Sequence, residues 1–300
     1  MSDACRAVKA AKAKYRRTGK AQQVRFRSRK DPDQCFGFDA VSLKSTNVFS
    51  REHILMFLAS ENVPTPDAEG TRIVYQSGRW FVVVPVLKPV RRQRDPSLPT
   101  AAIDPGVRCF VTFYSERGVG QIGKQDFGRI QRLCSHYDEL QSRMSQAKSR
   151  QKQRMLKAMR RMRWRIRDLI RDLHAKTAKF FAETFSRVFI PAFETQQMVS
   201  RLRSKTARAM LTFSHFAFRQ ALQHACKLTG CVVEVVSEAY TSRTCSYCGT
   251  VHPKNSRPTL RCCNTTLDRD LNGARGIYLR ALRASSCGTS VPLHCIGNNL

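Results

Sequence analysis

The sequence is poor in acidic residues. Its 300 residues include 22 Asp and Glu against 53 Lys and Arg, which gives a formal net charge of +31 at pH 7. A chain with so large an excess of one sign repels itself unless an anionic partner neutralises it. Nucleic acid is the first candidate, because dense Lys and Arg displace counterions from phosphates. An anionic membrane surface is the second.

Long apolar runs are absent as well. No segment approaches the roughly 20 apolar residues that a membrane-spanning helix needs. The N-terminal stretch MSDACRAVKAAKAKYRRTGKAQQ also lacks the apolar core of a secretory signal. We therefore expect an intracellular protein that is not secreted and has no membrane partner, in the nucleus or the cytoplasm of its host. In such a chain, twelve cysteines indicate buried thiols and a metal site rather than a disulfide framework.

The order of patterns predicts an α/β domain after residue 100. Apolar, β-branched runs within 33–95 predict a small antiparallel unit, and the charged, Pro-containing stretch 91–99 predicts a boundary. Strands that alternate with helices favour an α/β architecture. Two strands separated by a turn at Pro105-Gly106 are predicted within 101–115, and further strands at 187–194 and 231–238. Helices are predicted at 129–185, 195–229 (with Gly230 as C-cap) and 270–284.

Three carboxylates stand at the ends of predicted elements, beside apolar runs: Asp104 in AAIDPG, Glu194 in FIPAFE and Asp270 in DRDLNGAR. Each has an ordinary structural explanation, since Asp104 could cap the Pro-Gly turn, Glu194 could begin a helix and Asp270 could be an N-cap. Together they fit a site for Mg²⁺, which prefers carboxylate oxygens. Two such ions activate water and stabilise the leaving oxygen of a phosphodiester.

Four cysteines form two pairs. Cys245 and Cys248 have the spacing of a zinc knuckle, and Cys262 and Cys263 follow fourteen residues later. Two pairs at this separation predict a ribbon that binds structural Zn²⁺, with ordinary reduced thiols as the alternative. Because consecutive Cα atoms are only about 3.8 Å apart, we expect Cys262 and Cys263 to reach one ion only with strained backbone. His252 is an alternative fourth ligand.

Residues 141–180 contain fourteen Lys and Arg and two acidic residues, with a thin apolar stripe at helical spacing. Charge runs are usually solvated helix faces. Here Trp164 stands among arginines, and we favour a contact with nucleic acid. His174 is expected in the core or at a phosphate, and less as a general base, because two-metal sites do not require one.

At this point the sequence shows a resemblance. In chain order, IDPG, IPAFET, YTSRTCSYCG and CNTTLDRDLNGARGIYLRAL resemble the C-terminal half of the TnpB transposon-encoded nucleases, especially the eukaryotic and viral relatives called Fanzor. The resemblance covers about residues 100–284 and, more weakly, 20–90. It implies an RNase H-like (RuvC) domain formed by residues 100–240 and 266–284. A zinc ribbon at 241–265 splits this domain, a basic segment with a partial, wedge-like β-barrel at 1–95 precedes it, and a flexible tail at 285–300 follows it.

The resemblance also implies an activity, which is RNA-guided cleavage of DNA by a protein of a mobile element, with DNA and a guide RNA as partners. Asp104, Glu194 and Asp270 match the family's three catalytic acids and would bind Mg²⁺. Asp270 is matched instead of Asp268 because the family's acid stands two residues before an Asn, here Asn272.

This chain departs from the family pattern in two ways, and these departures suggest alternative functions. The family's ribbon ends in a second CxxC, and the chain begins near what resembles the later barrel strands, so we expect an N-terminally shortened protein. The alternative function is a catalytically silent nucleic-acid-binding remnant without a recognition region. A zinc-ribbon adaptor for RNA is a third reading, which leaves Asp104 and Glu194 unexplained. The sequence does not indicate an oligomeric state.

Overall fold

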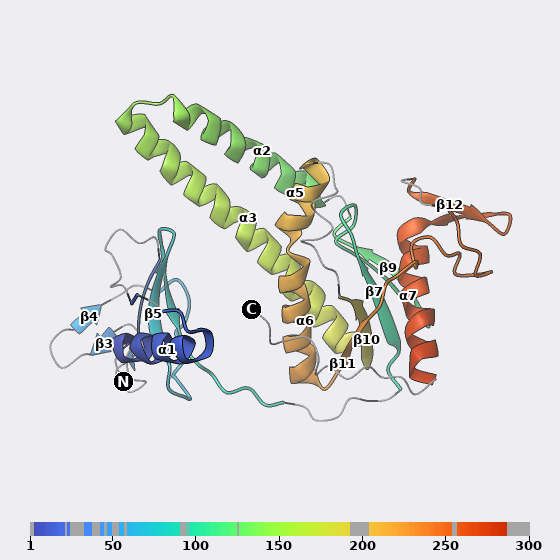
Figure 1. Cartoon of the computed structure of the whole chain (residues 1–300), viewed down its shortest axis with the longest axis horizontal. Helices are drawn as coiled ribbons and strands as arrows, with labels where there is room; N and C mark the ends of the chain where they lie inside the picture. The colour runs from blue at the N-terminus through green and yellow to red at the C-terminus, as the bar shows by residue number, and fades with distance from the viewer. Residues whose placement is uncertain are drawn as a thin grey trace. The chain divides into compact units, whose positions relative to one another are not determined.

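The structure is a computed structural model that describes residues 3–21, 23–24, 33–37, 43–44, 47–49, 54–56, 59–90, 95, 97–124, 126–192, 204–253 and 257–286. The chain divides into two compact units, Met1–Leu87 and Lys88–Leu300 (Figure 1). This division lies just before 91–99, the boundary expected from the sequence.

The first unit contains helix α1 (Asp3–Thr18) and two small antiparallel sheets. One sheet has the order β1-β5-β6 and the other β2-β3-β4. Ser77 and Gly78 have φ angles of 48° and 93°, which suits the two-residue turn that joins β5 to β6. The described strands do not form a closed barrel. The strands are β1 (Asp33–Gly37), β2 (Leu43–Lys44), β3 (Asn47–Phe49), β4 (Ile54–Met56), β5 (Arg72–Gln76) and β6 (Arg79–Val83).

The second unit is built on a mixed five-stranded sheet of order β11-β10-β7-β8-β9. β7, β10 and β11 are parallel, and the hairpin strands β8 and β9 continue the sheet antiparallel. The predicted strands are therefore confirmed, whereas β9 was not predicted because its sequence, GVGQI, carries few large apolar residues. The strands are β7 (Thr100–Pro105), β8 (Val111–Ser115), β9 (Gly118–Ile122), β10 (Arg187–Pro191) and β11 (Val232–Val236).

Five helices complete the described part of this unit. The long helical stretch predicted at 129–185 is two helices, α2 and α3, which form an antiparallel hairpin (Figure 1). Gly230 caps α6 with a φ angle of 78°, as predicted. None of the described helices combines the length and the apolarity that crossing a bilayer requires. The helices are α2 (Asp126–Ser145), α3 (Ser149–Thr184), α5 (Ser204–Phe213), α6 (His215–Thr229) and α7 (Arg269–Ser286).

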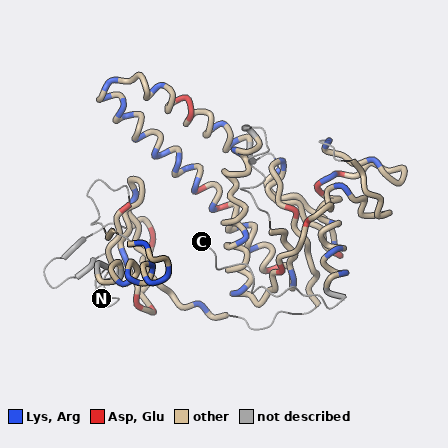
Figure 2. Tube along the Cα trace, in the orientation of Figure 1, with Lys and Arg blue, Asp and Glu red and all other residues tan. Residues whose placement is uncertain are grey.

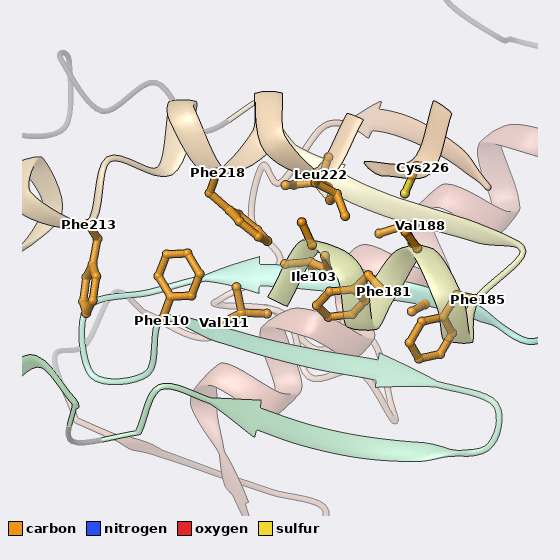
Figure 3. Close-up of a cluster of buried hydrophobic side chains, with 14 of the residues drawn as sticks. Ile103, Phe110, Val111, Phe181, Phe185, Val188, Phe213, Phe218, Leu222 and Cys226 are labelled. Carbon is orange, nitrogen blue, oxygen red and sulfur yellow. The ribbon is translucent and has the colours of Figure 1, made fainter. Parts of the chain in front are cut away.

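The core of the second unit lies on both faces of its sheet. Figure 3 shows the larger cluster, in which Phe110 and Val111 from the sheet side meet Phe181 of α3 and Phe218 of α6. A smaller cluster on the other face joins Ala102 and Phe189 to α7, through residues that include Ile277. Burial of these side chains on both faces gives a mixed α/β fold with helices on each side.

Candidate metal centres

The alternation of side chains along β7 determines which face of the sheet Asp104 lies on. Successive side chains of a strand face opposite sides of its sheet. Ala101 and Ile103 belong to the larger core cluster, whereas Ala102 packs in the cluster with α7. Asp104 follows Ala102 by two residues. It therefore faces α7, the helix that carries Asp270.

Asp104 is tightly enclosed on that face. Gly273 of α7 lies so close that a Cβ atom there would stand 2.4 Å from Asp104 Oδ2. Burial raises the pKa of Asp104 well above its usual value, and the negative charges of Asp270 and Glu238 raise it further. Positive charge at Arg269 opposes that rise. A bound divalent cation would relieve the repulsion that Asp104 experiences from these two carboxylates, so the residues present fit such an ion.

The first turn of α7 separates the roles of its two aspartates. Asp268 Oδ1 accepts hydrogen bonds from the backbone N–H groups of Asp270 (2.8 Å) and Leu271 (3.1 Å), so Asp268 is the N-cap. The alternative in which Asp270 caps the helix is therefore wrong. The Asp270 carboxylate instead accepts a hydrogen bond of 2.6 Å from Arg108 Nη2, in a partly exposed ion pair.

Glu194, the third acid expected from the sequence, lies outside the described residues. Glu238 was missed. It follows β11 by two residues, after Val236, which packs against the α7 cluster, and burial raises the pKa of its carboxyl. A usable signal existed, because Glu238 stands just after a strand that runs parallel to β7 and β10. The carboxyl ends of parallel strands share one edge of the sheet, where ligands bind in α/β folds. Asp104, Glu238 and Asp270 are called the acid site below.

The four cysteines of the two pairs converge. Their sulfurs all lie within 4.8 Å of one another, and in the described part of the chain they are the one group of three or more candidate ligands gathered so closely. The Sγ atoms of Cys248 and Cys262 are 3.5 Å apart, and those of Cys262 and Cys263 are 3.8 Å apart. Cys245 completes the group, whereas His252, the alternative ligand, is not part of it. These sulfurs could hold a tetrahedral metal ion.

A hairpin turn explains how two adjacent cysteines reach one point. Cys263 and Asn264 have φ angles of 53° and 55° and form the two-residue turn between β12 (Thr259–Cys262) and β13 (Thr265–Asp268). Positive φ is uncommon for residues other than glycine, yet it is the conformation that such a turn requires. The left-handed backbone at Cys263 is the strain expected from the sequence.

The thiols differ in acidity. Hydrogen bonds from Thr250 lower the pKa of Cys248 to about 6, which favours a thiolate there at neutral pH. The hydrogen bond to Cys248 raises the pKa of Cys263 to about 12. A thiolate beside three further sulfurs is a soft donor set of the kind that binds Zn²⁺.

The cysteine ribbon, defined here as residues 244–268, is anchored to α7. The buried side chain of Asn272 donates from Nδ2 to the Thr244 carbonyl at 2.8 Å, and its Oδ1 accepts the N–H of Ser246 at 2.9 Å. The Arg275 guanidinium lies 3.8 Å from the centroid of the Tyr247 ring. These contacts begin two residues after Asp270, so the ribbon braces the helix that presents this acid.

His174 and Trp164 belong to the core. His174 Nε2 lies 2.8 Å from the Phe213 carbonyl oxygen, the ring stacks on Phe110, and burial lowers its pKa. Trp164 is only 3% exposed. Its ring lies beneath the Arg167 guanidinium, 5.2 Å from the ring centroid. Neither ring is therefore displayed to nucleic acid.

Comparisons with known proteins agree with the motifs. A family model described as the Cas12f1-like TNB domain matches residues 215–277. A "Putative transposase" of Paramecium bursaria Chlorella virus 1 is 33% identical over 221 residues, which is 72% of this chain and 51% of that protein. A TnpB-like protein of Acanthamoeba polyphaga mimivirus is 26% identical over 223 residues, which is 68% of this chain and 41% of that protein. The chain thus spans about half the length of the curated relatives it matches.

Solved structures with a similar fold include a Cas12f1–sgRNA–target DNA complex, with a TM-score of 0.45 and 19% identity over 69% of this chain and 55% of that one. A CRISPR–Cas12f ternary complex gives 0.46 and 18% over 70% of this chain and 46% of that one. The family model covers Glu238, Asp270 and the four paired cysteines, and together with the relatives this match supports a TnpB-family protein.

Proposed function

We propose that the chain is a divalent-metal-dependent, RNA-guided DNA endonuclease of a mobile element, with an RNase H-like (RuvC) sheet and a structural zinc ribbon. The observation that carries this proposal is the surroundings of Asp104. Its carboxylate faces α7 in a tight site, and the charges of Asp270 and Glu238 raise its pKa. Acids are scarce in this chain, so their concentration at one sheet edge supports a cation site.

Two Mg²⁺ ions held at these carboxylates would supply an activated water and stabilise the leaving oxygen of the phosphodiester. Asp104, from the central strand, and Asp270, from α7, are proposed as ligands. Glu238 is proposed as a further ligand. Glu194, which follows β10 in the sequence, remains a candidate from the resemblance to TnpB. The Arg108 guanidinium now bonded to Asp270 would move to a phosphate when that carboxylate binds metal.

A stripe on α3 supports a nucleic-acid partner. Between Ser149 and Arg167 the helix has nine Lys and Arg and no acidic residue, and Figure 2 shows this basic stretch. Farther along, Lys176 and Lys179 pair with Asp172 and Glu183. Five exposed basic residues recur three or four positions apart, so they share one helix face: Arg150, Arg154, Lys157, Arg161 and Arg165.

This stripe is proposed to contact the phosphates of the guide RNA, the partner that the TnpB resemblance implies. The logarithm of the RNA-binding constant falls linearly as the logarithm of the salt concentration rises. Exchange of Arg154, Lys157 and Arg161 for Gln should make this fall shallower by roughly 2 to 3 units of slope, because each phosphate contact contributes about 0.7 to 0.9. Lys176 and Lys179, already paired with acids, provide the matched control. An unchanged slope in the triple variant would show that the stripe does not contact the RNA phosphates.

The test of the enzymatic proposal is cleavage of DNA by the protein purified with its RNA, in Mg²⁺, for the wild type and Asp270→Ala. We expect cleavage to be lost and RNA binding to stay within about twofold, because one carboxylate contributes little to phosphate contacts. Asp172→Ala, an exposed acid on α3, is the control and should cleave normally. Wild-type protein that binds RNA tightly without cleaving DNA would favour the silent, nucleic-acid-binding remnant.

A further inference from the structure

A cavity of about 310 Å³ opens where the cysteine ribbon meets the start of α7. Its lining includes Tyr240, Arg243, His252, Leu260 and Arg269 and no acidic residue. The cavity is at the small end of the range for ligand pockets. The guanidinium groups of Arg243 and Arg269 in this wall favour an anionic ligand.

The aromatic wall is held in an unusual conformation. Tyr240 is 64% exposed and has a φ angle of 66°, which is uncommon for a residue other than glycine. The Tyr240 carbonyl fixes this conformation by accepting hydrogen bonds from the N–H groups of Arg243 (2.9 Å) and Thr244 (3.0 Å). Backbone strain of this kind collects at binding sites, and here it displays a large aromatic face that the core does not use.

The remaining wall offers polar groups around an apolar floor. Arg243 donates from Nε to the His252 carbonyl at 3.0 Å, and its Cζ lies 5.7 Å from the centroid of the Tyr240 ring. His252 Nε2 is buried and makes no hydrogen bond within the described residues. Such a buried ring nitrogen calls for a partner. Leu260, which is 4% exposed, supplies the apolar surface.

The cavity adjoins the acid site. Arg269 lines it and directly precedes Asp270 in α7, and the charge of Arg269 lowers the pKa of Asp104. An aromatic face, an apolar floor, two guanidinium groups and an unpaired imidazole nitrogen are the components that hold a base and its phosphate. We propose that this cavity binds one unpaired nucleotide of the DNA strand next to the phosphate that is cut. Its base would stack on Tyr240, and its phosphate would lie at Arg243 and Arg269.

This assignment rests on the proposed nuclease function for the identity of the strand, whereas its test does not require cleavage. The binding of a labelled eight-nucleotide deoxythymidine oligomer is measured by fluorescence anisotropy in EDTA. A second oligomer of equal length is abasic, so it keeps the phosphates and lacks the stacking faces. Zinc content and thermal unfolding of each variant report whether the ribbon stays folded.

We expect Tyr240→Ala to weaken binding of the deoxythymidine oligomer by roughly tenfold, as the loss of one stacked base does. Binding of the abasic oligomer should stay within twofold, and Tyr240→Phe, which retains the ring, should bind both oligomers as the wild type does. The matched control is Phe216→Ala. Phe216 is 56% exposed and also carries an arginine, Arg219, over its ring at 5.2 Å, but it is not among the residues that line the cavity.

Equal binding by Tyr240→Ala and wild type would overturn the proposal, as would an equal loss for the abasic oligomer. A loss confined to an RNA oligomer of matching sequence would overturn the assignment to a DNA strand. Failure of the nuclease proposal gives a different result, because the wild type then does not cleave DNA while the Tyr240 dependence in EDTA persists.

Discussion

The carboxylate of Asp104 lies against the backbone of Gly273, where a Cβ atom would stand 2.4 Å from Oδ2. Any side chain at this helix position must displace the carboxylate that β7 directs at α7. Glycine is unfavourable in a helix interior, so helix formation does not explain Gly273. Its role is to leave room for the Asp104 carboxylate.

Gly273→Ala should abolish most DNA cleavage, by roughly 100-fold or more, because an acid displaced by about 1 Å no longer holds its geometry. Cleavage in Mg²⁺ by the RNA-bound protein checks this. The matched control is Gly128→Ala in α2, where a Cβ would meet nothing within 4 Å. Equal activity of Gly273→Ala and wild type would show that Asp104 has room to move without consequence.

Asn272 ties α7 to the ribbon through bonds from both ends of its amide. Asn272→Asp keeps the shape and leaves the Thr244 carbonyl without its donor. We expect unfolding in urea to show a loss of about 2 kcal/mol, the usual cost of an unsatisfied buried group. Asn264→Asp, at the exposed hairpin turn, should change stability little. A neutral Asn272→Asp would mean that the ribbon is held by other contacts.

One Zn²⁺ per chain should bind at Cys245, Cys248, Cys262 and Cys263. Cys263→Ser should weaken zinc binding by more than about 100-fold, because even the loss of outer-sphere partners costs 10- to 100-fold. Competition with a chromophoric chelator measures the affinity, and Cys5→Ser, outside the cluster, is the control. If His252→Gln lost zinc and Cys263→Ser kept it, His252 and not Cys263 would be the fourth ligand.

Burial lowers the pKa of His215 to about 4, against about 6.5 in an unfolded chain. Between about pH 6.5 and 4 the unfolded state therefore binds a proton at His215, whereas the folded state does not. Its contribution to stability is complete above pH 6.5 and is lost as the pH falls toward 4, by about 2 kcal/mol at pH 5. His215→Phe retains a ring against Phe110 and should make the fall in stability between pH 7.5 and 5 shallower by that amount, in urea unfolding. An identical fall in both proteins would contradict the buried, neutral state of His215.

The strands and helices of the second unit follow from apolar periodicity, so most of them could be predicted. β9 could not, because its Gly120 packs beneath the Phe113 ring, where a Cβ would stand 2.4 Å from the ring, and this is a tertiary contact. The break between α2 and α3 has no Gly or Pro to signal it.

The site was partly predictable for similar reasons. Asp104 and Asp270 could be found because Asp104 stands near the end of an apolar strand and Asp270 stands at the start of a helix. Glu238 follows β11 by two residues, just before the YTS segment, and its nearness to Asp104 comes from the parallel order of β7, β10 and β11. The convergence of Cys262 and Cys263 depends on a left-handed turn that no residue pattern announces, since neither Cys263 nor Asn264 is glycine.

The acid site itself is tested most directly by binding of Mn²⁺, which substitutes for Mg²⁺ and is detected by electron paramagnetic resonance of the free ion. We expect wild-type protein to take up Mn²⁺, and Asp104→Asn, with unchanged thermal unfolding and zinc content, to take up at least about tenfold less, because it loses a direct ligand. Equal uptake by the two proteins would contradict the claim that Asp104 belongs to a metal site.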